Sequence, residues 1–211
     1  MLSPAEVADI HRLAAAVPYR FDGAAFRAIL DRPYDHRQIA VATSFQAGTT
    51  QLGRLKNSLN AYADPAGFNA GPKALHAACV YYGGLGHALA LDDAMWEKYP
   101  IATLTDTEMH GASSPYAERA KALKTNLSAA DYRAMVVDRG VSFFVCNNAF
   151  SGFSYNVARA VMPSSTPVTR EIVVAIQDEM VTHFLPGTTL VPAGVAALNA
   201  AQEARFTFLP E

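Results

Sequence analysis

Short, continuously apolar segments alternate with helical segments along most of this 211-residue chain. The helical segments between them are about 10–15 residues long, a spacing typical of strand–helix–strand units. Strands that are apolar on both faces belong in a parallel sheet with helices on each side. We therefore expect an α/β fold, a three-layer sandwich with a mostly parallel central sheet of about five strands. The expected strands are Gln38–Ser44, Leu75–Tyr82, Val141–Cys146, Thr189–Val191 and an extended end at Arg205–Phe208.

A helical extension precedes this alternating body. Ser3–Glu6 has the pattern of a helix start, with a capping serine, a proline in the first turn and a glutamate that closes a capping box. A second short helix is expected at Ala24–Leu30. The sequence thus predicts an N-terminal helical extension at 1–35 and one α/β domain at 36–211. Within that domain, residues 100–125 follow neither the helix nor the strand period, and we expect an irregular insertion there.

Composition excludes several classes of protein. Hydrophobic residues make up 51% of the chain and charged residues 17%, so a disordered chain is excluded. A net charge of −2 without runs of like charge gives no binding surface for nucleic acid or for an anionic membrane. No apolar run reaches the roughly 18–20 residues of a membrane span, and the N-terminus lacks the features of a signal peptide. We expect a cytoplasmic protein as the sequence is written, or a periplasmic one if a signal was removed.

Three loops follow the first three expected strands. In a parallel sheet, ligands bind outside the carboxyl ends of the strands, where the loops run into helix N-termini. The first loop, Ser44–Thr50, is rich in hydroxyls and contains Gln46 and Thr49; it suits either an anion or an ordinary capped turn. The second contains Gly84 and His87, which permit close backbone approach and bring an imidazole to a helix start.

The third loop carries the most chemistry. Cys146 ends an apolar strand and begins a helix, where partial exposure and the helix dipole lower a cysteine pKa and favour a reactive thiolate. Asn147 and Asn148 can orient a sulfur-bound group through hydrogen bonds without adding charge. The alternative is a structural Cys146 that packs as a small apolar residue. Cys79, in the middle of a strand, is expected in the core.

Two segments, Asp138–Ala149 and Phe184–Val195, carry the most distinctive sequence, and Ala196–Phe208 and Lys56–Asn60 fit the same pattern. On these segments the sequence resembles the DsrE/DsrF-like family, over about 37–209, with looser agreement in the loops after the first two expected strands. The resemblance implies a parallel, flavodoxin-like α/β sandwich that assembles into homo-oligomers. It also implies that the residue matching Cys146 carries a persulfide, as in the sulfur-relay members, including the TusD-like proteins.

The resemblance implies a sulfur-donor or sulfur-acceptor partner, either a protein or a small sulfur compound, and no cofactor. Asn147, Asn148 and the Gly83–His87 loop would form the pocket around Cys146. The N-terminal extension and the insertion depart from the small carriers and are closer to a larger branch of undefined role, often exported by a twin-arginine signal.

Two alternatives remain open in the sequence. The Ser44–Thr50 loop could hold the phosphate of a nucleotide or flavin in a non-catalytic binding module. Asp106, Glu108 and His110 alternate, so an extended backbone would put all three on one side, as a site for a divalent transition metal. The sequence contains no Gly-x-Ser-x-Gly motif of the serine hydrolase kind. A Cys146–His87 pair would require both side chains to meet at the sheet edge.

Overall fold

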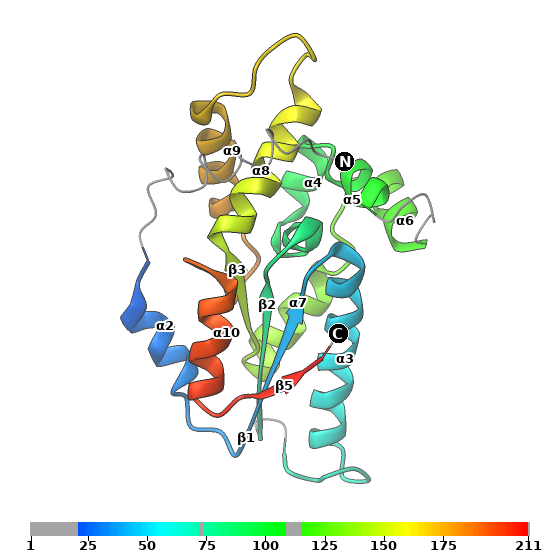
Figure 1. The fold of residues 1–211 in the computed structure, drawn as a ribbon. Coiled ribbons are helices and arrows are strands. Elements are labelled where there is room, and N and C mark those ends of the chain that lie inside the picture. Colours follow the sequence, from blue (N-terminus) through cyan, green and yellow to red (C-terminus); the bar gives the residue numbers. More distant parts are fainter. Residues whose placement is uncertain (1–20, 72–73, 109–114, 211) are drawn as a thin grey trace.

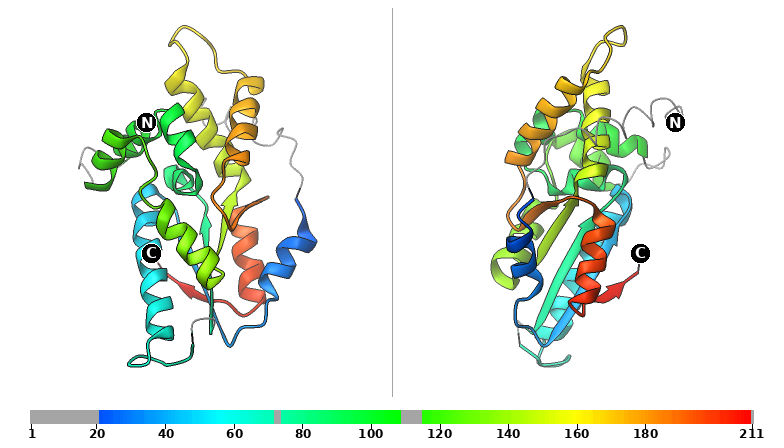
Figure 2. Two further views of the ribbon diagram at one scale, coloured as in Figure 1. Left: turned by 180° about the vertical axis from the view of Figure 1, so that it is seen from behind. Right: turned by 60° about the vertical axis from the view of Figure 1, so that its left-hand side comes forward.

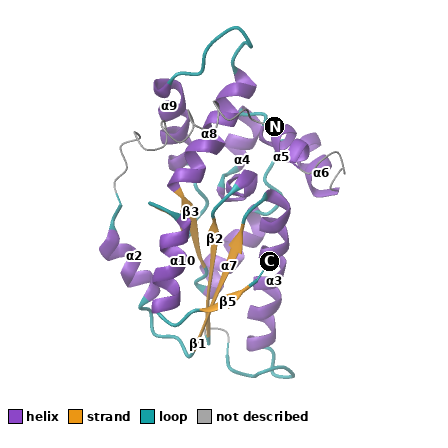
Figure 3. Ribbon diagram, viewed as in Figure 1, coloured by secondary structure: helices purple, strands orange, loops and turns teal. Residues whose placement is uncertain are grey.

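The central sheet is five-stranded and entirely parallel, with the order β4-β3-β2-β1-β5. It belongs to a computed structural model that describes residues 21–71, 74–108 and 115–210. The strands are β1 (His36–Ala42), β2 (Leu75–Tyr81), β3 (Ser142–Cys146), β4 (Thr188–Val191) and β5 (Thr207–Leu209). All residues of β2 and β3 are buried, which explains their continuously apolar sequences. Figures 1 and 3 show the strands in the middle of the molecule with helices around them.

Helices cover both faces of the sheet (Figure 2), so the predicted three-layer α/β sandwich is confirmed. One face carries the larger hydrophobic cluster and the other a smaller cluster under two helices. The larger face is covered by α3 (Phe45–Ala63), the 3-10 helix η1 (Gly84–Ala90), α4 (Asp93–Lys98), α5 (Ile101–Glu108), α7 (Ala129–Arg139), α8 (Asn147–Val161) and α9 (Arg170–Thr182). The smaller face is covered by α2 (Gly23–Leu30) and α10 (Gly194–Glu203).

The segment expected to be an irregular insertion is largely helical. It contains α5 and α6 (Pro115–Leu123), and residues 109–114 lie outside the described part. Ile101 and Thr105 of α5 are fully buried. The same helix contains four other threonines or carboxylates, and these polar residues obscure the helical period in the sequence. Asn126, after α6, donates through Nδ2 to the carbonyls of Leu89 and Leu91 at 2.8 and 2.7 Å. These bonds attach the segment to η1.

The described part of the N-terminal extension packs directly on the sheet. Phe26 of α2 meets Phe144 of β3 edge to face, with ring centroids 5.0 Å apart. After α2, Tyr34 stacks on His76 of β2 at 4.8 Å. The capping pattern expected at Ser3–Glu6 lies outside the described residues. The helix expected at Ala24–Leu30 is therefore confirmed, and it forms part of the layer that covers the smaller face.

Candidate functional site

The carboxyl edge of the sheet collects all three loops that the sequence singled out. The chain steps from β1 through β2 and β3 to β4, and α10 then returns it to β5 on the other side of β1. The direction of winding therefore reverses between β1 and β5, the position where open parallel sheets bind ligands. Figure 1 shows α4, α8 and α9 standing above this edge.

Cys146 is the last residue of β3 and the N-cap of α8. Side chains alternate along a strand, and Phe144 points into the smaller cluster, so Cys146 points to that same face. It is buried, with 5% of the residue's surface exposed, so the partial exposure expected at this strand end is not found. Cys79 is fully buried in the larger cluster, on the opposite face of the sheet. The two cysteines thus differ in face, in depth and in their distance from the carboxyl edge.

The first residue of α10 packs closely over Cys146. A Cβ added to Gly194 would lie 3.2 Å from the Cys146 Cβ and 2.9 Å from the Tyr82 Cβ, so only glycine allows the helix to start this near. Neither α8 nor α10 has a side-chain cap hydrogen bond, and the N-termini of both helices lie beside Cys146.

The two asparagines after Cys146 have different surroundings. Asn147 is buried, and its Oδ1 accepts a hydrogen bond from Gln177 Nε2 at 2.7 Å. The Gln177 Oε1 in turn accepts the Ser151 hydroxyl at 2.8 Å. Asn147 therefore joins α8 to α9, and this network was not predicted because the partner lies 30 positions away. Asn148 is exposed, so of the two amides it is the one that faces solvent beside the site.

His87 is fully buried and does not join the cysteine. Its Nδ1 lies 3.0 Å from the carbonyl oxygen of Gly84, and its ring lies between those of Phe150 and Phe153, at 5.8 and 6.2 Å. Burial lowers the pKa of His87 to about 4, so the ring is neutral at neutral pH. It belongs to the large-cluster face, whereas Cys146 points to the other face. The structure therefore gives no support to a Cys146–His87 pair.

The β1–α3 loop is a capped turn that borders a polar hollow. Ser44 Oγ accepts the N–H of Ala47 at 3.0 Å, and the Thr49 hydroxyl donates to the carbonyl of Gln46 at 2.8 Å. Thr49 is thus used within the helix, while the exposed Gln46 lines the hollow. The hollow measures about 250 Å³. That volume is below the range of about 300–1,000 Å³ for sites that enclose larger ligands, so it does not favour a whole flavin or nucleotide.

The backbone that the predicted metal site required is absent. The site needed an extended segment, but α5 makes residues 106 and 108 helical. Positions two apart on a helix lie about 200° apart around its axis, so the alternation in the sequence does not define one side of this helix. Asp106 pairs with Lys121 at 3.7 Å, and His110 lies outside the described residues. Within the described ranges, no three histidine, cysteine or carboxylate side chains form a group that could hold a metal ion.

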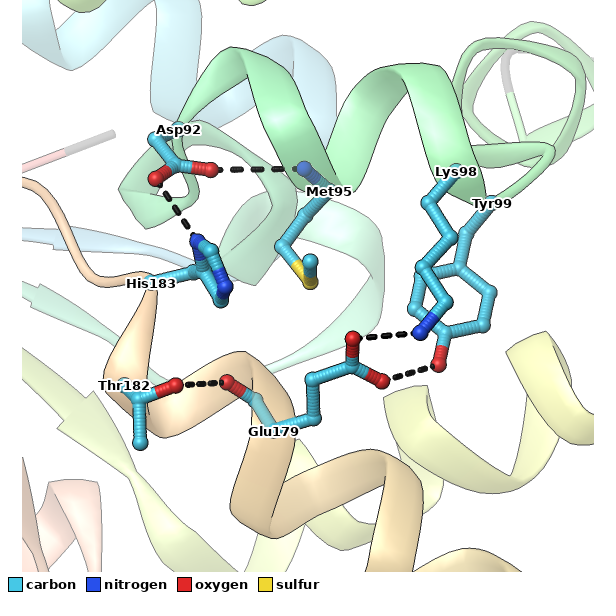
Figure 4. Close-up of polar contacts among 7 residues, drawn as sticks. All are labelled: Asp92, Met95, Lys98, Tyr99, Glu179, Thr182 and His183. Atoms are coloured by element: carbon cyan, nitrogen blue, oxygen red, sulfur yellow. Dashed lines mark hydrogen bonds and ion pairs between the residues drawn. The ribbon is translucent and has the colours of Figure 1, made fainter.

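A polar clamp between α4 and α9 was not predicted from the sequence (Figure 4). His183 Nδ1 lies 2.8 Å from Asp92 Oδ2, and the Tyr99 hydroxyl donates to Glu179 Oε2 at 2.7 Å. Lys98 binds the other oxygen of Glu179, and this ion pair is the main reason that the pKa of Glu179 is lowered. Because Asp92, Lys98 and Tyr99 all bind side chains at the end of α9, the clamp explains how α9 is held beside α4.

Comparison with known proteins gave no match: no family model, no curated protein and no solved structure is similar to this chain. The described helices include none that is both long and apolar enough to cross a membrane.

Proposed function

We propose that this protein accepts and hands on sulfane sulfur as a persulfide of Cys146. The observation that carries the proposal is the position of this thiol, at the carboxyl end of a central strand and beside the N-termini of both α8 and α10. An all-parallel sheet agrees with the resemblance to DsrE/DsrF-like proteins. Membership of that family is part of the proposal.

The transfer needs no cofactor. The Cys146 thiolate attacks the outer sulfur of a donor persulfide; a new S–S bond forms as the donor's S–S bond breaks, and the donor leaves as a thiol after taking up a proton. An acceptor thiolate then attacks the outer sulfur of the Cys146 persulfide, and Cys146 leaves as a thiolate. The two uncapped helix ends stabilise the negative charge that the sulfur carries in both steps.

The edge around Cys146 suits a partner that comes to the thiol. Tyr82 and Val195 are large exposed hydrophobic residues, 39% and 51% accessible, and they flank Gly194 in space or in sequence. Exposed apolar side chains beside a reactive group favour docking of a donor or acceptor protein. We further propose that the protein forms a homo-oligomer. Its sulfur donor and sulfur acceptor would be in the same compartment as the protein.

The test is mass spectrometry after incubation with a small persulfide donor. We expect the wild-type protein to gain about 32 Da, the mass of one sulfur atom, and to lose it to added thiol. Cys146→Ser should gain nothing. Cys79→Ser is the matched control, because it removes the other cysteine from the opposite face and should still gain the mass. A wild-type protein that gains no sulfur, while its Cys146 also resists alkylation, would overturn the proposal.

A further inference from the structure

A cavity of about 360 Å³ lies between α2 and α10, which run side by side over the smaller face of the sheet (Figure 1). Its volume is within the range of about 300–1,000 Å³ that is usual for small-molecule sites. Cys146 does not line this cavity, so the sulfur proposal does not use it. We propose that the cavity binds a free α-amino acid with an apolar side chain.

The walls of the cavity are largely buried apolar side chains. Phe26 and Leu30 of α2, Val191 at the end of β4 and Ala197 of α10 all line it, and all four are buried. Phe21 adds a second aromatic ring, whose centroid lies 5.5 Å from that of Phe26. Such walls favour a ligand with an apolar body, because its binding removes apolar surface from water.

The space between the two helices is held open by the residues around it. Most α10 positions that line the cavity are alanines, whose short side chains leave the space unfilled. Beyond the ends of the helices, Arg37 donates through Nη1 to the carbonyl of Ala204 at 2.7 Å and through Nη2 to that of Arg32 at 3.2 Å. Ala204 follows α10 and Arg32 follows the C-cap of α2, so Arg37 fixes the spacing of the two helix ends. The cavity is therefore preformed.

The charged side chains of the lining gather toward one end of the cavity. The α10 helix returns the chain to the amino edge of the sheet and α2 leads directly into β1, so both helices end at the amino edge. Asp31 follows α2, Glu203 is the last residue of α10, and Arg27 lies about one turn before Asp31. All three side chains are exposed, and within the described ranges none of them forms an ion pair. The cavity thus has an apolar end and an end with charges of both signs.

An apolar amino acid matches both ends. Its carboxylate would bind Arg27, whose guanidinium can donate two parallel hydrogen bonds, and its ammonium group would bind Glu203 or Asp31. A simple amine would leave Arg27 without a partner, and a simple acid would bring its carboxylate near two others without an ammonium group to offset them. The rings of Phe21 and Phe26 favour an aromatic side chain, so phenylalanine is the probe of choice.

An NMR titration of the isotope-labelled full-length protein tests the proposal. The probes are L-phenylalanine, phenethylamine, which lacks the carboxylate, and phenylpropionate, which lacks the ammonium group. We expect phenylalanine to give saturable shifts of amide signals from α2 and α10. The other two probes should bind about two- to fivefold more weakly, because a pair between exposed charges is individually weak.

Variants of the charged end should separate the two halves of the ligand. Arg27→Gln should weaken the binding of phenylalanine and phenylpropionate about two- to fivefold and leave that of phenethylamine unchanged. Glu203→Gln should weaken the binding of phenylalanine and phenethylamine and spare phenylpropionate. Arg133→Gln is the matched control, because it removes an exposed arginine from α7 on the larger face and should change none of the three affinities.

Filling the apolar part should abolish binding of all three probes. Ala200→Phe places a ring in the cavity, whereas Asn199→Phe, at the next position of α10 but outside the lining, should bind phenylalanine as the wild type does. If Ala200→Phe does not fold, the Arg27 and Glu203 variants decide. No phenylalanine binding, shifts confined to other elements, or equal affinities for the three probes would overturn the proposal. Cys146→Ser should bind phenylalanine normally, so this result is independent of the sulfur proposal.

Discussion

The two faces of the sheet are built very differently. The larger face is packed with aromatic side chains from the sheet and from several covering helices, including Phe143 of β3, whose ring centroid lies 4.0 Å from that of Tyr132 in α7. The smaller face is covered by α2 and by the alanine-rich α10, whose short side chains leave a mainly apolar cavity of about 360 Å³ between the two helices. Cys79 lies on the first face and Cys146 on the second.

The difference between the two faces indicates which of them can accommodate a reactive side chain. A cysteine surrounded by interlocking aromatic rings is sealed from reagents, and the packing there supplies stability. A cysteine at the end of the thinly covered face keeps a small exposed surface and stands beside two helix ends. We therefore infer that the larger face stabilises the fold and the smaller face allows access to Cys146.

Truncation of adjacent phenylalanines on opposite faces should give the largest effects. Phe143→Ala should cost about 4–5 kcal/mol of unfolding free energy, because its ring neighbours on the larger face cannot close around the cavity left behind. Phe144→Ala should cost about 3 kcal/mol, because its partner Phe26 borders the existing cavity and can shift. Urea unfolding of both variants measures the difference. A larger loss for Phe144→Ala would contradict the division of roles.

Acid should destabilise the protein through a buried histidine on each face. Burial lowers the pKa of His87 to about 4, and burial together with Arg32 and Arg37 lowers the pKa of His76 to about 4. Both values lie below the value of 6.5 for an exposed histidine, so the unfolded chain binds protons first as the pH falls. Stability should be complete above pH 6.5, fall between about pH 6.5 and 4, and then level off with respect to these two groups.

For His87 alone, the loss should be about 3 kcal/mol. His87→Leu should flatten this part of the curve of unfolding free energy against pH, and His76→Leu should do so independently. A variant that keeps the wild-type slope would show that its histidine is protonated in the folded protein.

Substitution of Gly194 should have a smaller effect that is confined to the Cys146 edge. In Gly194→Ala the new methyl group would crowd Tyr82 and Cys146, so we expect a loss of about 1–3 kcal/mol and a changed rate of Cys146 alkylation. Gly53→Ala in α3 is the matched helix control: its Cβ would meet nothing within 4 Å, and it should stabilise the protein by about 0.5–1 kcal/mol. An unchanged rate of Cys146 alkylation in Gly194→Ala would show that α10 does not influence the surroundings of the thiol.

The sequence predicts those features of the fold that depend on local patterns. Continuous apolar runs indicate the parallel sheet, and Gly140 follows α7 with a left-handed φ of 68°, a conformation that glycine adopts readily. The helix α5 was missed because Thr105, a polar residue, occupies a fully buried position and weakens the apolar period. Between η1 and α4 the chain is extended at Leu91, whose bridge to Phe184 depends on a contact distant in sequence.

The candidate site was predictable only in part, for the same reason. The position of Cys146 follows from one strand and one helix, both visible in the sequence. The bond from Gln177 to Asn147, the approach of Gly194 and the placement of His87 on the opposite face depend on how separate elements pack. No local pattern encodes these contacts, so they required the structure.

The central claim is that Cys146, and not Cys79, carries sulfur. Peptide-resolved mass spectrometry after treatment with a persulfide donor, followed by alkylation under native conditions, tests it most directly. We predict one additional sulfur on the peptide that contains Cys146 and none on the peptide that contains Cys79. Sulfur on Cys79, or equal labelling of both cysteines in the folded protein, would contradict the account.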